Sequence, residues 1–397
     1  MSMSQQTFDC VIVGGGLVGM SLASALADSA YKILLLEQNN AAPLHNNVLD
    51  LRTTGLTRSS EKVLTQAGLW DAIQAHVTPI ERLDISEQGN FGGARIDANE
   101  HQLSPIGYMM PNDRLMSILS EHVSTQENLT VWSPAKLEAL TKREQGYQLT
   151  LDIDGQPQTV NANLLVGADG ARSQVRQLLH MGFDHKDYQQ TAIISIVRPE
   201  KAHNNIAYER FTSHGPLAVL PVQEQCCALI WTQPTQHSQN YLEMDDVSFL
   251  NALQKAFGYR LGRFQAVGKR SAYPLSLTVS QTLTEADAVL IGNAAQSVHP
   301  VAAQGFNLGL RDVQTLVNCL ASSNPAHTDM NALLAEYRRA RQKDRDHVIK
   351  LTDNLTRLFA PQATPIKAMR SIGLRMIANL PFAQRNVLRR NFGLRYL

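Results

Sequence analysis

The sequence has few cysteines, and no motif commits them to metal or redox chemistry. Its four cysteines, Cys10, Cys226, Cys227 and Cys319, form no Cys-x-x-Cys pair and have no histidine cluster nearby. Neither a zinc site nor a redox dithiol is therefore expected, and we expect no bound metal. Buried structural thiols are typical of a reducing compartment, which favours a cytoplasmic location.

Long hydrophobic runs are also missing. No stretch of about 18 apolar residues occurs, so no membrane-spanning helix is expected. Residues 1–9 are polar and lead directly into an apolar strand, which is not the pattern of a secretory signal peptide. With 397 residues, 44% hydrophobic and 18% charged, the chain has the composition of an ordered globular protein of two or three domains.

Acidic residues are absent from the end of the chain. The net charge of +1 gives no reason to expect nucleic acid binding overall. Residues 354–397, however, contain eight lysines and arginines, many apolar residues, and no aspartate or glutamate. Such a basic, apolar tail can lie on an anionic surface such as the inner membrane, or dock on a partner protein. It can equally be a helical region packed on the domain with its basic face in solvent, and periodicity does not separate these alternatives.

The N-terminal segment has the pattern of a nucleotide-binding βαβ unit. An apolar strand at residues 8–13 ends in Gly14-x-Gly16-x-x-Gly19, a helix follows, and a second strand closes with Glu37. The first glycine permits a tight turn, the second lets a pyrophosphate approach the backbone, and the third lets the helix pack on the strand. The carboxylate at the end of the second strand can bind ribose hydroxyls. This pattern predicts a dinucleotide site without deciding between NAD and FAD.

The order of strands and helices predicts an α/β fold in which one domain interrupts another. Short strands separated by turns after about residue 185 indicate an antiparallel sheet. We expect a discontinuous Rossmann-like domain, an inserted antiparallel-sheet domain and a C-terminal helical region. The Rossmann-like domain would comprise residues 1–79, 111–184 and 283–345, the sheet domain residues 80–110 and 185–282, and the helical region residues 346–397.

Two further glycine-rich elements follow apolar strands. One is Gly167-Ala168-Asp169-Gly170, and the other runs from Gly292-Asn293 through a His-Pro loop to Gln304-Gly305-Phe306-Asn307-Leu308-Gly309. A strand, a glycine turn and a second glycine turn opening a helix would bring backbone N–H groups to one point, which suits an anion.

Together these elements resemble those of the class A flavoprotein aromatic hydroxylases, and among them the ubiquinone-biosynthesis hydroxylases that act on polyprenylated phenols. The resemblance covers nearly the whole chain and rests on residues 11–19, 50–56, 167–173 and 292–312. It implies that the Rossmann-like domain binds FAD, that the fold is like that of para-hydroxybenzoate hydroxylase, and that the inserted sheet domain carries the substrate.

The resemblance implies roles for particular residues. Asp169 would lie near the pyrophosphate, and Arg52 and Arg114 match arginines that contact the FAD phosphate or ribityl chain. The family's third element normally begins Gly-Asp, where this chain has Gly292-Asn293. An amide can hydrogen-bond a ribityl hydroxyl without the charge, so we expect weaker FAD binding. The sequence Gly-Asn-Ala-Ala-Gln resembles the branch that acts on 2-polyprenyl-6-methoxyphenol.

The third element is expected to form the catalytic part of the flavin site. Backbone N–H groups of Gln304, Gly305, Phe306 and Asn307, with the positive end of the helix dipole, would face the flavin edge that becomes negative on reduction. Pro300 would lie over the ring and leave room for oxygen at C4a. The resemblance implies that a flavin C4a-hydroperoxide then transfers OH to an electron-rich phenol, chemistry that belongs mainly to the cofactor.

The substrate and the electron donor are less constrained. Apolar candidates for the wall facing the phenol and its isoprenoid tail are Tyr208, Phe211, Leu220, Pro221 and Trp231, although each residue type belongs more often to a plain core than to a pocket. No second glycine fingerprint for NAD(P)H is present. The flavin would be reduced by a transiently bound NAD(P)H or by another external donor.

Three functions remain open on the sequence alone. The first is hydroxylation of a polyprenylated phenol by FAD and O2 in ubiquinone biosynthesis. The second is the same chemistry on a soluble aromatic substrate. The third is a non-catalytic, flavin-binding scaffold subunit of a biosynthetic assembly. The weaker FAD contact expected at Asn293 and the basic tail support this alternative.

Overall fold

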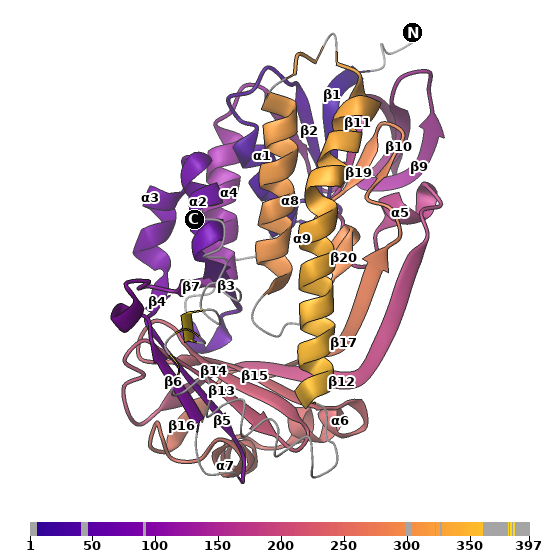
Figure 1. Ribbon diagram of the computed structural model, residues 1–397. Helices are drawn as coiled ribbons and strands as arrows, with labels where there is room; N and C mark the ends of the chain where they lie inside the picture. Colours follow the sequence, from indigo (N-terminus) through magenta and orange to yellow (C-terminus); the bar gives the residue numbers. More distant parts are fainter. Residues whose placement is uncertain are drawn as a thin grey trace.

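The computed structural model describes residues 6–40, 47–89, 93–298, 304–321, 323–325, 328–359, 380, 382 and 384–385. These residues form two large sheets with helices between and around them (Figure 1). The α/β fold class expected from the sequence is confirmed. Of the C-terminal helical region, only residues up to 359 and the few positions from 380 onward are among those described.

A mixed, eight-stranded sheet is the centre of the nucleotide-binding domain. Its strands are β1 (Gln6–Val13), β2 (Ile33–Leu36), β8 (Leu129–Trp132), β9 (Lys136–Lys142), β10 (Tyr147–Ile153), β11 (Gln156–Gly167), β18 (Thr284–Glu285) and β19 (Ala288–Leu290). The order is β18-β19-β11-β1-β2-β8, and β10 and β9 extend from β11 as an antiparallel ribbon. Because β1 pairs in parallel with both β11 and β2, the turns after these strands meet at one edge of the sheet.

Helices cover this sheet because its strands are apolar on both faces. Val11, Ile12, Leu34 and Leu35 are fully buried, as expected for strands covered from both sides. The helices of this domain are α1 (Leu17–Ala25), α2 (Arg58–Gln66), α3 (Trp70–Ile73), α4 (Asn112–Ser124), α5 (Gln174–Leu178) and α8 (Gln304–Ala321). Helix α1 contacts both α4 and α8, so the first and third glycine elements are packed together through their helices.

A nine-stranded sheet forms the substrate domain. Its strands are β5 (Arg82–Glu87), β6 (Gly93–Asp97), β12 (Phe183–Pro199), β13 (Ile206–Thr212), β14 (Gly215–Pro221), β15 (Cys227–Pro234), β16 (Phe264–Val267), β17 (Ser271–Ser280) and β20 (Gln296–Ser297). The order is β20-β17-β12-β15-β14-β13-β5-β6, with β16 on β12. The pairs are antiparallel, as the alternating pattern indicates, except that β5 pairs in parallel with β13. The domain boundaries stay a prediction. Strand β20 belongs to the predicted Rossmann-like segment 283–345 but pairs with β17 in the substrate sheet.

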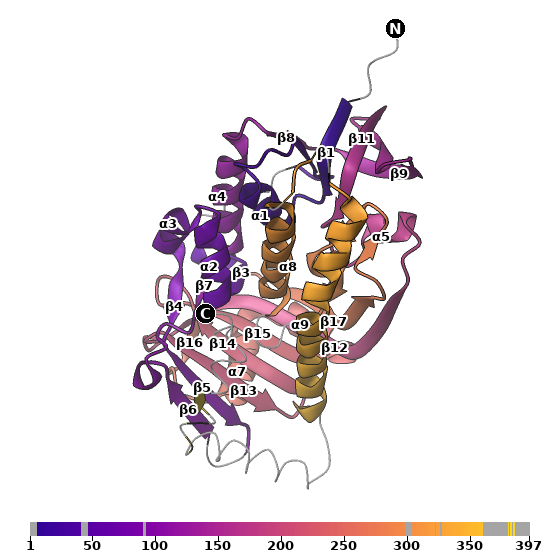
Figure 2. The same cartoon turned by 45° about the horizontal axis from the view of Figure 1, so that its top comes forward.

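The two faces of the substrate sheet have different neighbours. Helices α6 (Thr235–Glu243) and α7 (Asp246–Phe257) cover one face, where Trp231 packs edge-on against Phe249. The other face lies toward the nucleotide-binding domain (Figures 1 and 2). There Ile196 and Ala228 share an apolar cluster with Met109 from a small sheet. That sheet consists of β3 (Thr53–Thr57), β4 (Thr78–Ile80) and β7 (Gly107–Pro111), in the order β3-β7-β4.

Helix α9 (Met330–Phe359) connects the two domains. Figure 1 shows it running from the nucleotide-binding sheet to the β12 end of the substrate sheet. Near this end Asp353 accepts a hydrogen bond of 2.9 Å from the Tyr188 hydroxyl and forms an ion pair with Lys186, both on β12. Among the helices that are described, none is long and apolar enough to cross a membrane.

Candidate active site

The glycines of the first element have three different surroundings. Gly14 has φ +110°, and a Cβ built there would lie 2.6 Å from the Ala168 carbonyl oxygen. A Cβ at Gly19 would lie 1.9 Å from the Gly14 oxygen. A Cβ at Gly16 would meet no atom within 4 Å. Gly14 and Gly19 are thus required by packing and turn geometry, whereas Gly16 borders open space at the start of α1.

The N-terminus of α1 offers free hydrogen-bond donors to that space. Gly16 is the N-cap and supplies no side-chain cap, and the first turn contains no acidic residue. The first N–H groups of a helix have no partner within the helix, and together with the helix dipole they bind phosphate. We therefore place the FAD pyrophosphate beside Gly16.

Glu37 is held against the glycine turn. Its Oε2 accepts a 2.8 Å hydrogen bond from the Gly15 amide, and its Oε1 accepts bonds of 2.8 and 3.0 Å from the backbone and side chain of Asn39. A carboxylate has about four acceptor positions. Glu37 is therefore oriented by the protein and keeps acceptor capacity for a ribose hydroxyl.

Asp169 uses its carboxylate inside the protein. It accepts hydrogen bonds from the Ser173 hydroxyl (2.6 Å) and from the amides of Gln174 (2.6 Å) and Val175 (3.0 Å). These bonds fix the loop that begins at Ala168, whose carbonyl touches the Gly14 position. Asp169 therefore shapes the wall of the nucleotide site by capping α5.

Arg176 ties the second glycine element to the third, a link that the sequence did not reveal. The buried guanidinium donates to the carbonyl oxygens of Ala171 and Ala294, each at 2.8 Å. Burial lowers the pKa of Arg176, with Asp169 acting in the opposite direction. No local motif marks a single arginine that spans 118 residues in this way.

Asn293 faces the start of α8. Gly292, with φ +58°, precedes it, and the Asn293 side chain is exposed with its Oδ1 4.0 Å from a Cβ position at Gly305. Within the described part of the chain its amide makes no hydrogen bond. It is therefore available to a ligand lying between the third element and the first turn of α8.

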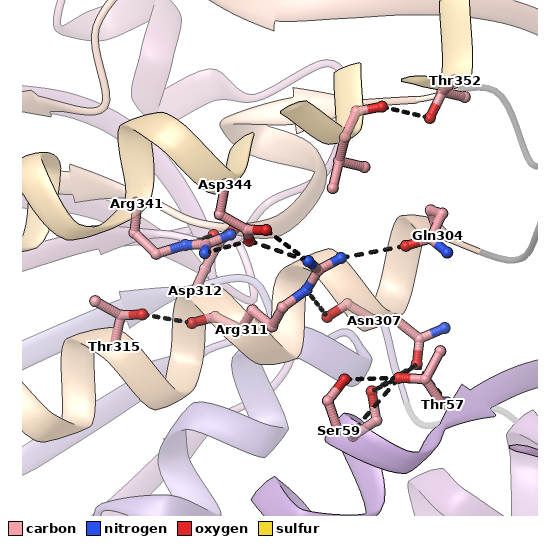
Figure 3. Close-up of polar contacts among 12 residues, drawn as sticks. Thr57, Ser59, Gln304, Asn307, Arg311, Asp312, Thr315, Arg341, Asp344 and Thr352 are labelled. Carbon is pink, nitrogen blue, oxygen red and sulfur yellow. Dashed lines mark hydrogen bonds and ion pairs between the residues drawn. The ribbon is translucent and has the colours of Figure 1, made fainter. Parts of the chain in front are cut away.

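The side chains in the first turn of α8 contact other parts of the protein. Phe306 is half-buried on the main core, and the Gln304 Oε1 accepts a 3.2 Å bond from Arg311. The buried Asn307 Oδ1 accepts from the Thr57 N–H at 2.9 Å, and Asn307 Nδ2 donates to the Gly55 carbonyl at 2.8 Å. Figure 3 shows the Asn307 side chain beside Thr57. The Asn307 side chain therefore joins α8 to β3. Pro300 lies outside the described residues.

A buried ionic network joins α8 and the third glycine element to helix α9 (Figure 3). The Asp312 Oδ2 accepts from the Gly292 amide at 3.0 Å and from the Gln296 side chain at 2.7 Å, and its Oδ1 accepts from Arg341 Nε at 2.7 Å. Asp344 bridges Arg341 (2.6 Å) and Arg311 (2.9 Å). Burial opposes the charge on Arg341, but Asp312, Tyr337 and Asp344 together more than offset this effect, so the pKa of Arg341 is raised.

Arg52 and Arg114 are cations without acidic partners in the described structure. Arg52 is exposed and its guanidinium carbon lies 5.6 Å from the ring centre of Tyr273 on the substrate sheet. Arg114 is half-buried at the start of α4. Both charges are free to meet a phosphate. Tyr273, 38% exposed, is a candidate site residue that the sequence did not single out.

The structure divides the five substrate candidates between the two sheet faces. Tyr208 and Trp231 are 7% and 3% exposed and pack in the cluster beneath α7. By strand alternation, Pro221 shares that face. Phe211 and Leu220 point to the face that lies toward the nucleotide-binding domain. We therefore propose Phe211 and Leu220, and not the other three, for the substrate wall.

The residues present fit FAD. We propose three separate contacts. The uncapped N-terminus of α1 beside the open space at Gly16 would bind the pyrophosphate, the oriented Glu37 carboxylate a ribose hydroxyl, and the Asn293 amide the ribityl chain. No group of three or more potential metal ligands occurs among the residues that the structure covers.

Asp312→Ala should lower the free energy of unfolding by about 3–5 kcal/mol, because it leaves Arg341 charged, buried and without its main partner. Urea unfolding of the purified protein measures this. The control is Glu138→Gln, which removes an exposed ion pair with Lys136 and should change stability by less than about 0.5 kcal/mol. Equal effects of the two variants would contradict the assigned role of Asp312.

Gly16→Val should leave the fold intact and raise the FAD dissociation constant by about a hundredfold or more, because the new side chain enters the pyrophosphate space. Gly19→Val should instead lower the melting temperature of the apoprotein, because its Cβ collides with the Gly14 carbonyl. Flavin fluorescence titration and thermal unfolding separate the two effects. Loss of folding in both variants would contradict the distinction.

Asn293→Asp should tighten FAD binding by about tenfold, because a charge-assisted hydrogen bond replaces a neutral one. Asn293→Ala should weaken it. Isothermal titration of the apoprotein with FAD measures both changes, and identical affinities for all three proteins would show that this side chain does not contact the cofactor.

Comparisons with known proteins agree with this geometry. The family model described as FAD binding domain matches residues 7–352. The ubiquinone hydroxylase UbiL of Rhodospirillum rubrum is 34% identical over 387 residues, covering 97% of this chain and 89% of that protein. The 3-demethoxyubiquinol 3-hydroxylase of Escherichia coli is 29% identical over 396 residues, covering 99% and 100%.

Solved structures share the fold at lower identity. The p-nitrophenol 4-monooxygenase PnpA of Pseudomonas putida superposes with a TM-score of 0.81 at 17% identity, covering 96% of this chain and 97% of that one. PqsL of P. aeruginosa, in complex with 2-aminobenzoylacetate, gives 0.75 at 18% identity, covering 93% and 100%. With its flavin elements assembled at one site and its full-length relatives, the chain belongs to the FAD binding domain family, as an FAD-dependent monooxygenase of the group that includes the ubiquinone-biosynthesis hydroxylases.

Proposed function

We propose that this protein hydroxylates a polyprenylated phenol, of the 2-polyprenyl-6-methoxyphenol type, in ubiquinone biosynthesis. The observation that carries the proposal is the 34% identity to a ubiquinone hydroxylase across 97% of the chain. The Gly292-Asn293 sequence supports the particular branch through resemblance, and the exposed Asn293 amide is compatible with a neutral ribityl contact.

In the proposed reaction, FAD would supply the activation of O2, with two electrons that come from NAD(P)H or another external donor. One oxygen atom is added to the ring and the other leaves as water. The chain's own residues hold the cofactor through Gly14, Gly16 and Glu37. Backbone N–H groups at Gln304, Gly305 and Phe306, with the α8 dipole, stabilise negative charge on the reduced ring.

The substrate sheet offers an apolar wall on its inner face. In register across three strands, Ala218, Ile230 and Ile194 lie side by side on this face, and Leu220 lies on the same side. Ile194, Leu220 and Ile230 are only half-buried. Partly exposed apolar side chains on an inner face are what a phenol with an isoprenoid tail would cover.

Peripheral contact with the inner membrane, or with a biosynthetic complex, is the proposed role of the basic tail. The support is the +8 charge of residues 354–397 together with their apolar content. The described part of this tail includes the buried Gln384, which hydrogen-bonds His101 at 2.8 Å. At this point the chain therefore returns to the substrate domain.

Two alternatives have specific support. A soluble aromatic substrate is compatible with the fold shared with p-nitrophenol 4-monooxygenase. A non-catalytic scaffold subunit is compatible with the uncharged Asn293.

Deleting the gene, in a strain without a second copy of the function, should deplete ubiquinone and accumulate a prenylated phenol lacking one hydroxyl group, detected by mass spectrometry of lipid extracts. The wild-type gene should restore ubiquinone, and the Gly16→Val gene should not. Normal ubiquinone in the deletion strain would contradict the proposal, and full restoration by Gly16→Val would favour the scaffold.

A further inference from the structure

Glu209 lies on the inner face of the substrate sheet. It follows Tyr208 on β13, and because neighbouring side chains on a strand point to opposite faces, it points away from the α7 cluster that contains Tyr208. In register, it stands between Ile85 on β5 and Ala218 on β14. Glu209 therefore occupies the same row of side chains as Ala218, Ile230 and Ile194 of the proposed apolar wall.

This carboxyl group has no partner. In the described structure the half-buried side chain of Glu209 forms no hydrogen bond and no ion pair. The cations nearest in sequence and register are directed elsewhere: Arg210 donates to the Ala256 carbonyl of α7, and Arg260 pairs with Asp84 at 2.8 Å on that same outer face. On the inner face the nearest acidic residue by register is Glu87, opposite Phe211.

Such a group is costly unless it serves a ligand. Burial alone raises the pKa of Glu209 to about 7. A half-buried carboxyl on an apolar surface loses part of its hydration without gaining a protein partner, so a purely structural role would favour an apolar residue at this position. Groups whose pKa is shifted by burial to near neutral pH are typical of sites that transfer protons.

We propose that Glu209 is a catalytic residue whose carboxylate accepts the hydrogen bond of the substrate's phenolic hydroxyl and removes its proton. This inference rests on the proposed function and assigns a polar anchor to the otherwise apolar wall. It also implies specificity for a substrate with one hydroxyl group near the ring carbon to be oxidised and with apolar substituents elsewhere.

The proton balance is closed. The phenolic O–H bond breaks, the proton moves to the Glu209 carboxylate, and the ring gains the electron density that its attack on the flavin-activated oxygen requires. As the new C–O bond forms, the O–O bond breaks and the second oxygen atom leaves as water. The ring carbon then loses its hydrogen as a proton to solvent. Glu209 returns its proton to the ring oxygen, so the aromatic diol is released and the carboxylate is regenerated.

The pH dependence follows from the raised pKa. Below about pH 7 the Glu209 carboxyl is protonated and cannot accept the phenolic proton, so hydroxylation should rise as the pH passes through about 7. Because the folded-state pKa lies above that of an unfolded chain, the ionised form destabilises the fold, and this penalty develops as the pH rises from about 4 to 7. Glu209→Gln should therefore raise the melting temperature at about pH 8, where the wild-type carboxyl is charged, and change it less in acid.

Two measurements on the FAD-loaded protein test the proposal, with 2-geranyl-6-methoxyphenol as the probe. The first is the phenolate absorbance that develops when the probe binds to the oxidised holoenzyme. The second is a single turnover, in which dithionite-reduced holoenzyme with bound probe is mixed with oxygenated buffer and the hydroxylated product is quantified. Glu209→Gln should abolish the phenolate signal and lower product formation about a hundredfold, with hydrogen peroxide formed instead.

The controls separate this role from a structural one. Glu209→Asp should keep a reduced phenolate signal and the rising pH limb. Glu243→Gln, on exposed α6, should behave as wild type. An unchanged phenolate signal and pH limb in Glu209→Gln, or loss of folding in that variant, would overturn the assignment of Glu209. If wild type binds the phenolate but forms no product, the proposed function fails while the role of Glu209 in binding stands; if wild type does not bind the phenolate, the assignment of Glu209 fails.

Discussion

The buried carboxylate of Asp312 is the contact on which the rest of the site depends. It binds the amide of Gly292, the side chain of Gln296 and the guanidinium of Arg341, and so joins the third glycine element to helices α8 and α9. In the protein interior the attraction between Asp312 and its partners is strong, and a buried charge without a partner is costly. The three groups therefore have one favourable arrangement around Asp312. That arrangement places Asn293 at the start of α8, where the flavin contacts must converge.

The same helix positions the parts that come from elsewhere in the chain. Asn307 on α8 holds Gly55 and Thr57 of β3, and β3 follows directly on Arg52. Arg52 in turn lies over Tyr273 of the substrate sheet. The nucleotide site and the inner face of the substrate sheet are therefore linked through named contacts. Glu209, the unpaired carboxyl on that face, is the polar group that we assign to the substrate.

Local sequence patterns predicted helices and strands that depend on neighbouring residues. They did not predict contacts between segments that lie far apart in the chain. The strand, turn and helix that begin at residue 8 follow from an apolar run and the spacing of the glycines after it, whereas the division between α2 and α3 depends on Gly68, which has φ +70°. Alternation identified the strands but could not tell which face lies inward, so Tyr208 and Trp231 looked equal to Leu220. The parallel pairing of β5 with β13 and the ion pair of Asp312 with Arg341 each join segments far apart, so no local pattern reveals them. Glu209 belongs to no motif, so the sequence did not single it out.

The central claim is that this chain, with FAD bound at the assembled glycine elements, adds an oxygen atom from O2 to a prenylated phenol. The most direct measurement is mass spectrometry of the product formed when the reduced holoenzyme, with 2-geranyl-6-methoxyphenol bound, meets isotopically labelled dioxygen. The account predicts one hydroxyl group added to the ring, carrying one labelled oxygen atom. Recovery of unchanged phenol with all reduced flavin consumed to peroxide, or a product whose new oxygen comes from water, would contradict it.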